Sequence, residues 1–279
     1  MPRRPALPTA DLAWQKARRA GRRWSLWGAA VGVGLGMLAF APAAWLARGL
    51  HSASGERLLL ADAQGSVWAG SAVAVLQGGP GSLDAAALPG RLHWSMTPNW
   101  SGLTVKLKQA CCLQGELAIA VQPGWQGFTL SLPARAEGLG LWPAQWLSGL
   151  GAPWNTLQLG GQIRVATSGF KVQTVAGRTR LQGGIDLELL DARSRVSPVD
   201  PLGSYRLTLR SDANSGESAA LTLDTQGGAL RLTGTGQWTG ARLRFRGEAR
   251  AADGQEAGLA NLLNIIGRRQ GALSVISIG

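Results

Sequence analysis

The sequence has few of the residues that carry enzymatic chemistry. Its 279 residues include only two histidines, two cysteines and one tyrosine. His93 alternates with Leu92 and Trp94, which predicts the polar face of a strand, and no acid–base pair, nucleophile motif or phosphate-binding loop accompanies it. No group of His, Cys, Asp and Glu has metal-ligand spacing. We therefore expect a non-enzymatic protein with no catalytic residue, no metal site and no cofactor.

The two cysteines, Cys111 and Cys112, are adjacent, so the chain is not a disulfide-rich scaffold. Neighbouring residues on a regular strand point to opposite faces, and a bond between these two would need a turn and a distorted peptide. Two interpretations stay open. An exported domain lies in an oxidising compartment, which permits a disulfide. The alternative is that one thiol is buried and the other is packed at a bend. We prefer packed thiols and expect the pair to carry no function.

Long apolar runs are also scarce, with one exception. The run from Ser25 to Leu46 has no charged residue and as a helix would span about 33 Å, enough for a bilayer core of roughly 30 Å. Trp24, Trp27 and Trp45 mark its ends, where tryptophan favours the headgroup level. We predict a transmembrane helix over 25–46. A cleaved signal peptide is the alternative, but its apolar region is shorter, about 7–15 residues.

Positive charge is concentrated before this run. The formal net charge is +12, and half of it comes from residues that precede Ser25, where Asp11 is the only acid. The cations closest to the run are Lys16, Arg18, Arg19, Arg22 and Arg23. Cytoplasmic flanks of membrane helices carry such an excess, so we predict a cytoplasmic N-terminus and an exported C-terminal domain. No basic element typical of nucleic-acid binding is visible, and we expect no nucleic acid partner.

Glycines are spaced regularly within the apolar run. Gly28, Gly32 and Gly36 recur every four residues and would lie along one face of a helix. In lipid, small residues let two helices approach closely and gain packing contacts. We predict that this stripe packs against a second membrane helix. The alternative is that the glycines reflect composition alone.

Beyond the run, apolar residues fall two apart along most of the chain. Leu103, Val105 and Leu107 form one such set, and the intervening positions are polar. Period-two alternation predicts strands with one buried and one wet face, typical of an antiparallel sheet. An apolar-x-Gly unit recurs inside these strands, as in 68–70 and 232–234. Glycine inside a strand indicates a bend or a close approach by another part of the chain.

Two short segments break the alternation and predict helices. Pro143 to Leu150 begins with proline at a first helical position. Gln255 to Ile266 places leucine and isoleucine on one helical face, and a last strand is expected over 272–278. Three tryptophans, Trp142, Trp146 and Trp154, lie close to the first of these helices. They could form a ligand or partner surface, but we prefer core packing at the end of an open sheet.

These signals divide the chain into successive segments. We expect a basic cytoplasmic tail (1–24), a transmembrane helix (25–46), a stalk (47–64), the first half of an exported β domain (65–193), a connector (194–201) and the second half of that domain (202–279). The expected fold is mainly β: a single N-terminal transmembrane helix followed by a curved, mostly antiparallel sheet with two short helices.

Several short blocks give the chain a resemblance to a known family. They are Gly65-Ser-Val-Trp68-Ala-Gly70, the Leu-x-Trp-x-Met-x-Pro block at 92–98, Leu-Gly-Leu-Trp-Pro at 139–143, Pro-Leu-Gly-Ser-Tyr at 201–205 and the glycine-rich block at 228–236. With the apolar segment in front, their order resembles protein N of the bacterial type II secretion system. The resemblance implies an inner-membrane, single-pass accessory protein whose periplasmic β domain is AsmA-like. It implies no catalytic residues.

The resemblance also implies partners. These are other type II secretion components, namely the inner-membrane platform and, as a further candidate, the secretin. The expected role is to support export of folded proteins across the outer membrane. The alternative function is lipid binding or transport of the AsmA type, with phospholipid held on the apolar face of an open sheet.

Overall fold

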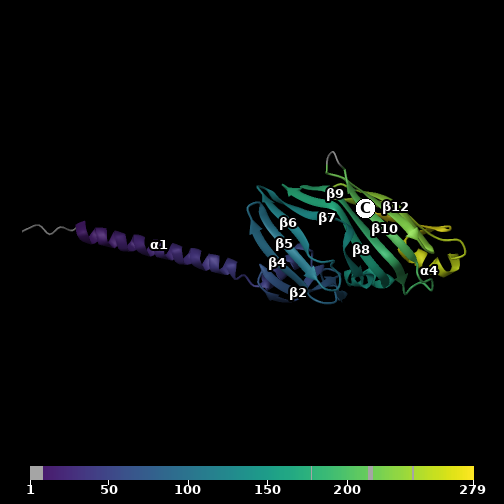
Figure 1. Ribbon diagram of the computed structural model, residues 1–279, viewed down its shortest axis with the longest axis horizontal. Coiled ribbons are helices and arrows are strands. Elements are labelled where there is room, and N and C mark those ends of the chain that lie inside the picture. Colours follow the sequence, from purple (N-terminus) through teal and green to yellow (C-terminus); the bar gives the residue numbers. More distant parts are fainter. Residues whose placement is uncertain (1–8, 177, 213–215, 241) are drawn as a thin grey trace, which may run out of the picture. The chain divides into compact units, whose positions relative to one another are not determined.

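The computed structural model describes residues 9–176, 178–212, 216–240 and 242–279, and the side chains from residue 24 onward within these ranges (Figure 1). The chain forms two compact units, one that ends at Pro42 and one over Ala43–Gly279. We describe each unit by itself.

The first unit contains helix α1 (Thr9–Ala39). The apolar run was expected to form one helix over 25–46, but α1 ends at Ala39 and α2 (Ala43–Ala53) begins after Pro42. Proline has no N–H to donate and disfavours helical geometry in the residue before it, so the chain leaves the helix here. Among the described residues, no helix is both long enough and apolar enough to cross a membrane.

The predicted topology signal lies within α1. Lys16, Arg18, Arg19, Arg22 and Arg23 are helical, and their side chains are outside the described part of the structure.

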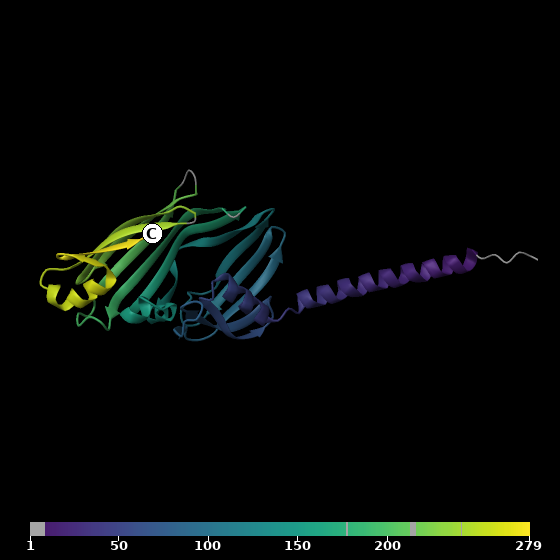
Figure 2. The same ribbon diagram turned by 180° about the vertical axis from the view of Figure 1, so that it is seen from behind.

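The second unit is built on one antiparallel sheet of 15 strands (Figures 1 and 2). The strands are β1 (Leu58–Gly65), β2 (Ala69–Gln77), β3 (Ala85–Ala87), β4 (Leu92–Asn99), β5 (Gly102–Gln109), β6 (Leu117–Gly124), β7 (Gly127–Pro143), β8 (Leu159–Val175), β9 (Arg178–Ser194), β10 (Gly203–Ser211), β11 (Ala219–Gly227), β12 (Leu230–Trp238), β13 (Leu243–Ala251), β14 (Arg268–Gln270) and β15 (Leu273–Ile278). Besides α2, the helices are η1 (Ala144–Leu150), α3 (Trp154–Leu157) and α4 (Glu256–Ile266). The predicted mainly β, antiparallel fold is confirmed.

Almost every strand pairs with the next strand in the chain. From β4 to β13 the order in the sheet is the order in the sequence, and β15 then pairs with β13, with β14 at its outer edge. Turns therefore alternate between the two ends of the strands. The β4–β5, β6–β7 and β8–β9 turns lie at one end, and we call this side of the sheet the hairpin edge. The helices η1, α3 and α4 lie at the other end of the strands, which we call the helix edge (Figure 1).

The segment boundaries differ from the expected ones. Residues 47–64 were expected to be a stalk, but they form the end of α2 and nearly all of β1. Ala43 and Ala47 of α2 are buried in a core cluster with Leu60 of β1, so this segment is part of the domain. Of the expected connector (194–201), Ser194 is the last residue of β9 and the others lie between β9 and β10. These two strands pair directly, so the sheet continues across this point without interruption.

The predicted alternation of faces is confirmed on β13. Phe245 and Ala249 are buried on one face, and Arg244, Arg246 and Arg250 are exposed on the other. The apolar face of the sheet contributes to three core clusters: one beside α2, one beside α4, and one between β8, β9 and β11. The two predicted short helices are also present, the first as a 3-10 helix (Ala144–Leu150) and the second as α4.

Several strand glycines lie beneath aromatic rings of the neighbouring strand. A Cβ on Gly70 would come within 2.6 Å of the Trp94 ring, and one on Gly234 within 2.5 Å of the Phe245 ring. Trp94 and Phe245 belong to strands that pair directly with these glycines' strands. The apolar-x-Gly units therefore give large rings a place to lie against the sheet.

Candidate functional site: an apolar groove

A cavity of about 410 Å³ lies on the apolar face of the second half of the sheet. We call it the apolar groove. Its floor comes from β9 to β13, and α3, α4 and β15 complete its walls. The floor includes Leu187, Leu207, Leu221, Leu223, Leu232 and Phe245. A cavity of this size with a wholly hydrophobic lining is typical of a site for an apolar ligand.

Strand register explains how one side of the groove becomes continuous. Leu187 of β9 is directly opposite Leu207 of β10, and Leu207 is directly opposite Leu223 of β11. Residues directly opposite each other on antiparallel strands project to the same face. Because leucine recurs at every second position, its side chains cover one face across three neighbouring strands.

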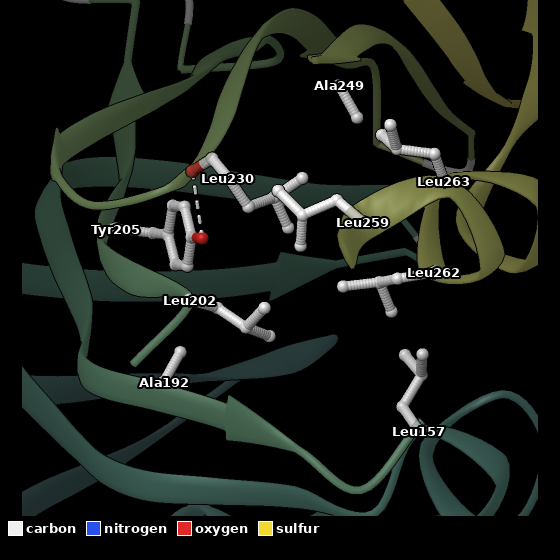
Figure 3. Close-up of a cluster of buried hydrophobic side chains, with 9 residues drawn as sticks. All are labelled: Leu157, Ala192, Leu202, Tyr205, Leu230, Ala249, Leu259, Leu262 and Leu263. Carbon is white, nitrogen blue, oxygen red and sulfur yellow. Dashed lines mark hydrogen bonds between the residues drawn. The ribbon is translucent and has the colours of Figure 1, made fainter. Parts of the chain in front are cut away.

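Tyr205 has the only hydroxyl group among the residues that line the groove. Its hydroxyl group donates a hydrogen bond to the backbone oxygen of Leu230 at 3.0 Å (Figure 3). The side chain is buried, and burial raises the pKa of the Tyr205 phenol above its ordinary range. The phenol is therefore neutral and already satisfied, and its ring adds to the apolar surface.

Helix α4 forms the wall at the helix edge. Leu259, Leu262 and Leu263 are almost fully buried in the cluster shown in Figure 3, and Leu262 and Ile266 also face the groove. The hydroxyl group of Ser274 on β15 donates to the backbone oxygen of Leu263 at 2.7 Å, which ties the helix to the sheet. The apolar stripe predicted for this helix is thus divided between the core and the groove.

The leucines of the groove are less buried than those of the core. Leu187, Leu207 and Leu221 are half-buried, and Ile278 at the end of β15 is 52% exposed. Half-exposed apolar side chains that line a cavity make the groove a candidate binding site. The groove can hold an apolar molecule by excluding water, and its side chains offer no group for bond-making chemistry.

The opposite face of the sheet is polar and carries a buried carboxylate. Glu188 on β9 lies between its register partners Arg164 on β8 and Arg206 on β10, and both arginines donate hydrogen bonds to it. The Glu188 side chain is only 8% exposed. Burial alone would raise the pKa of Glu188, but the hydrogen bonds and positive charges of Arg206 and Arg164 lower it below the ordinary glutamate value.

The three tryptophans that are close in the sequence lie in two different places in the structure. Trp142 and Trp146 pack against the core cluster beside α2, as the preferred interpretation had it, whereas Trp154 lines the apolar groove. His93 is exposed on its strand, and His51 lies in the last turn of α2. Among the described residues, no group of three His, Cys, Asp or Glu side chains could hold a metal ion.

The cysteine pair lies in the turn between β5 and β6, and its two sulfurs are bonded to each other. The structure therefore has the disulfide and not the packed thiols that we preferred. The turn provides the local geometry that a regular strand would not. Cys112 is buried in the cluster beside α2, and its carbonyl accepts a hydrogen bond from the Leu141 N–H at 2.8 Å.

Sequence reasoning placed the groove leucines on the buried face but did not show that they would stay half-exposed. The available signal was the absence of a matching partner layer, since only two short helical segments are predicted among the many alternating strands. Gly28, Gly32 and Gly36 lie on α1, and a Cβ added at any of them would meet nothing within 4 Å.

Fold and groove together define a mainly β protein with one antiparallel sheet and an apolar groove on one face. Comparison with known families gives a match to the family described as "Type II secretion system (T2SS), protein N" over residues 56–275, and the chain belongs to this family. The matched region begins just before β1 and ends within β15, so it covers the whole sheet except its last residues. No curated protein and no solved structure matches the chain.

Proposed function

We propose that this protein is a non-enzymatic accessory component of the type II secretion system that supports export of folded proteins across the outer membrane. The observation that carries the proposal is the family match, which extends over nearly the entire sheet. A site without acid–base chemistry fits a structural or binding role better than a catalytic one.

The proposed location is the inner membrane, with the N-terminus in the cytoplasm and the β domain in the periplasm. Family membership supports inner-membrane association, and the concentration of cations before an uncharged segment supports the orientation. The proposed partners are the inner-membrane platform and the secretin.

Deletion and complementation test this proposal. In a strain without the gene, secreted enzymes should accumulate in the periplasm, and the full-length chain should restore their release. Normal secretion in the deletion strain, with the other secretion components present at normal levels, would contradict the proposed role.

The groove supports a second candidate function, the binding of phospholipid acyl chains. Its lining is apolar, and the one phenol hydroxyl is already bonded. A bound peptide strand would need partners for its backbone N–H and C=O groups, and an acyl chain needs none. The chemistry of the lining therefore favours a hydrocarbon chain.

Mass spectrometry of gently purified full-length protein tests the lipid hypothesis. The variant L207Q/L221Q places two amides in the groove, and T208Q/T222Q is a matched control on the polar face. We expect phospholipid to copurify with the parent and the control and to fall severalfold in the groove variant. Equal lipid in all three proteins would exclude the groove as the binding site.

A further inference from the structure

Two tryptophans on the hairpin edge are fully exposed. Trp100 in the β4–β5 turn is 108% exposed, and Trp125 in the β6–β7 turn is 100% exposed. A large aromatic side chain is normally at least partly covered in a folded protein. Phe128 and Val175 beside these turns are 47% and 45% exposed. We call Trp100, Trp125, Phe128 and Val175 the tip surface.

The members of the tip surface lie on neighbouring turns of one edge (Figure 1). Gly127 at the second turn is the register partner of Val175 at the third, and the Ala176 N–H donates to the Gln126 oxygen at 3.1 Å. The first turn is next to the end of β6, because Leu103 pairs with Val121. The turns that carry the tip surface therefore follow one another along the hairpin edge.

The first turn is stabilised by internal hydrogen bonds. The Ser101 N–H and hydroxyl group both donate to the Asn99 side-chain oxygen, at 3.0 and 2.9 Å, and the Asn99 amide donates to the Thr104 hydroxyl oxygen at 3.0 Å. Its polar side chains thus have partners within the turn. The Trp100 ring projects from an ordered hairpin.

We propose that the tip surface docks onto the headgroup region of a phospholipid bilayer. Tryptophan has an apolar ring and one N–H donor, and it favours this region of a membrane. The first two turns, 97–104 and 122–129, have no charged residue, so no charge must be desolvated when they insert.

Charge and shape favour a bilayer over a protein partner. The third turn contributes the exposed cation Arg178, which suits a surface with anionic lipid. Tryptophans that anchor protein interfaces cluster centrally and fill pockets of the partner. Here the two tryptophans stand on separate turns at the same end of the strands and do not form one central cluster.

Lipid-dependent quenching tests the proposal. The native cysteines are bonded to each other, so a thiol-reactive dye labels only an added cysteine. Q126C places a dye at the second turn, and Q145C places it at an exposed position on η1, at the helix edge. The full-length chain is reconstituted into vesicles of phosphatidylethanolamine and phosphatidylglycerol that contain a lipid with a quencher on its acyl chain.

We expect quenching at position 126 to exceed that at position 145 at least about twofold. Adding W100S and W125S should lower it to the level at position 145, with an unchanged thermal midpoint because both rings are exposed. Equal quenching at the two positions, or no effect of the serine substitutions, overturns the proposal. A dye at 126 that stays in water in these vesicles, which contain no other protein, overturns the proposal as well. Neither result depends on the role in secretion or on the groove.

Discussion

At the scale of single residues, glycine and aromatic side chains are matched across strands. Phe245 of β13 lies over Gly234 and Gly247, and a Cβ at Gly234 would be only 2.9 Å from the Gly247 Cα atom as well as close to the ring. Backbone cannot move aside as easily as a flexible side chain. The absence of a side chain at Gly234 is thus required by its neighbours.

We predict that G234A destabilises the protein by about 1–3 kcal/mol, because the added methyl group overpacks the Phe245 contact. The matched control is G227A on β11, where a Cβ would meet nothing within 4 Å, and its effect should stay within about 0.5 kcal/mol. Denaturant unfolding of full-length protein measures both. Equal stability of the two variants would show that the ring does not need the space.

At the scale of secondary-structure elements, Glu188 joins three strands on the polar face. It accepts hydrogen bonds from Arg164 on β8 and Arg206 on β10. Because its pKa is lowered in the folded state, its contribution to stability is complete above the ordinary glutamate value of 4.5 and is lost as the pH falls through the folded-state pKa.

We predict that E188Q lowers the free energy of unfolding at neutral pH by about 1–3 kcal/mol, since two charged hydrogen-bond donors lose their carboxylate. The difference between parent and variant should shrink as the pH falls below 4.5. Asp186 lies on the same strand as Glu188 and forms a more exposed ion pair with Arg210 of β10. The control D186N removes this pair and should lower the free energy of unfolding by only about 0–1 kcal/mol. A parent–variant difference that stays constant down to strong acid would refute the role of the ionised carboxylate.

Helix α1 keeps the predicted glycine stripe on one side. The space around Gly28, Gly32 and Gly36 is open, which is compatible with a partner helix, and the association itself stays a prediction. We expect G32L to weaken association of α1 in a membrane-based two-hybrid assay, whereas G34L, which lies off the stripe, should leave it unchanged. Equal signals from both variants and the parent would show that the stripe reflects composition.

At the scale of the whole molecule, one sheet presents two separate apolar surfaces. The groove lies on the face between β9 and β15, and the tip surface lies at the hairpin edge of β4 to β9. The opposite face of the sheet is polar and carries the arginine and carboxylate pairs. An unbroken antiparallel sheet allows this division because side chains along each strand alternate between the two faces, whereas the turns at the strand ends carry residues of their own.

Topology is a prediction at this scale. A reporter that is active only in the periplasm, fused after Gly279, should be active, because the cations before Ser25 favour a cytoplasmic N-terminus. A reporter that works only in the cytoplasm should be silent at the same position. Replacing the five cations nearest the apolar run by serine should reduce the periplasmic signal. The reverse pattern of activities would rule out the proposed orientation.

Local patterns in the sequence are enough to predict the class of fold and the buried and exposed faces of its strands. Alternation depends on residues two apart, and the apolar stripe of α4 on residues three and four apart. Such local periods predict which side of β13 is polar and where helix 256–266 lies, whatever the rest of the chain does. The family blocks also follow from the sequence, because they are short and contiguous.

Which of the apolar residues are shielded from solvent can be seen only in the folded structure. Leu207 and Leu259 both lie on apolar faces, but Leu207 is half-buried in the groove and Leu259 is completely buried, because covering depends on elements distant in sequence. The same applies to the disulfide in its turn, to Phe245 over Gly234, and to the placement of Trp100 and Trp125 on neighbouring hairpins. Each depends on register and curvature, which arise from many strand pairings together and have no local period to reveal them.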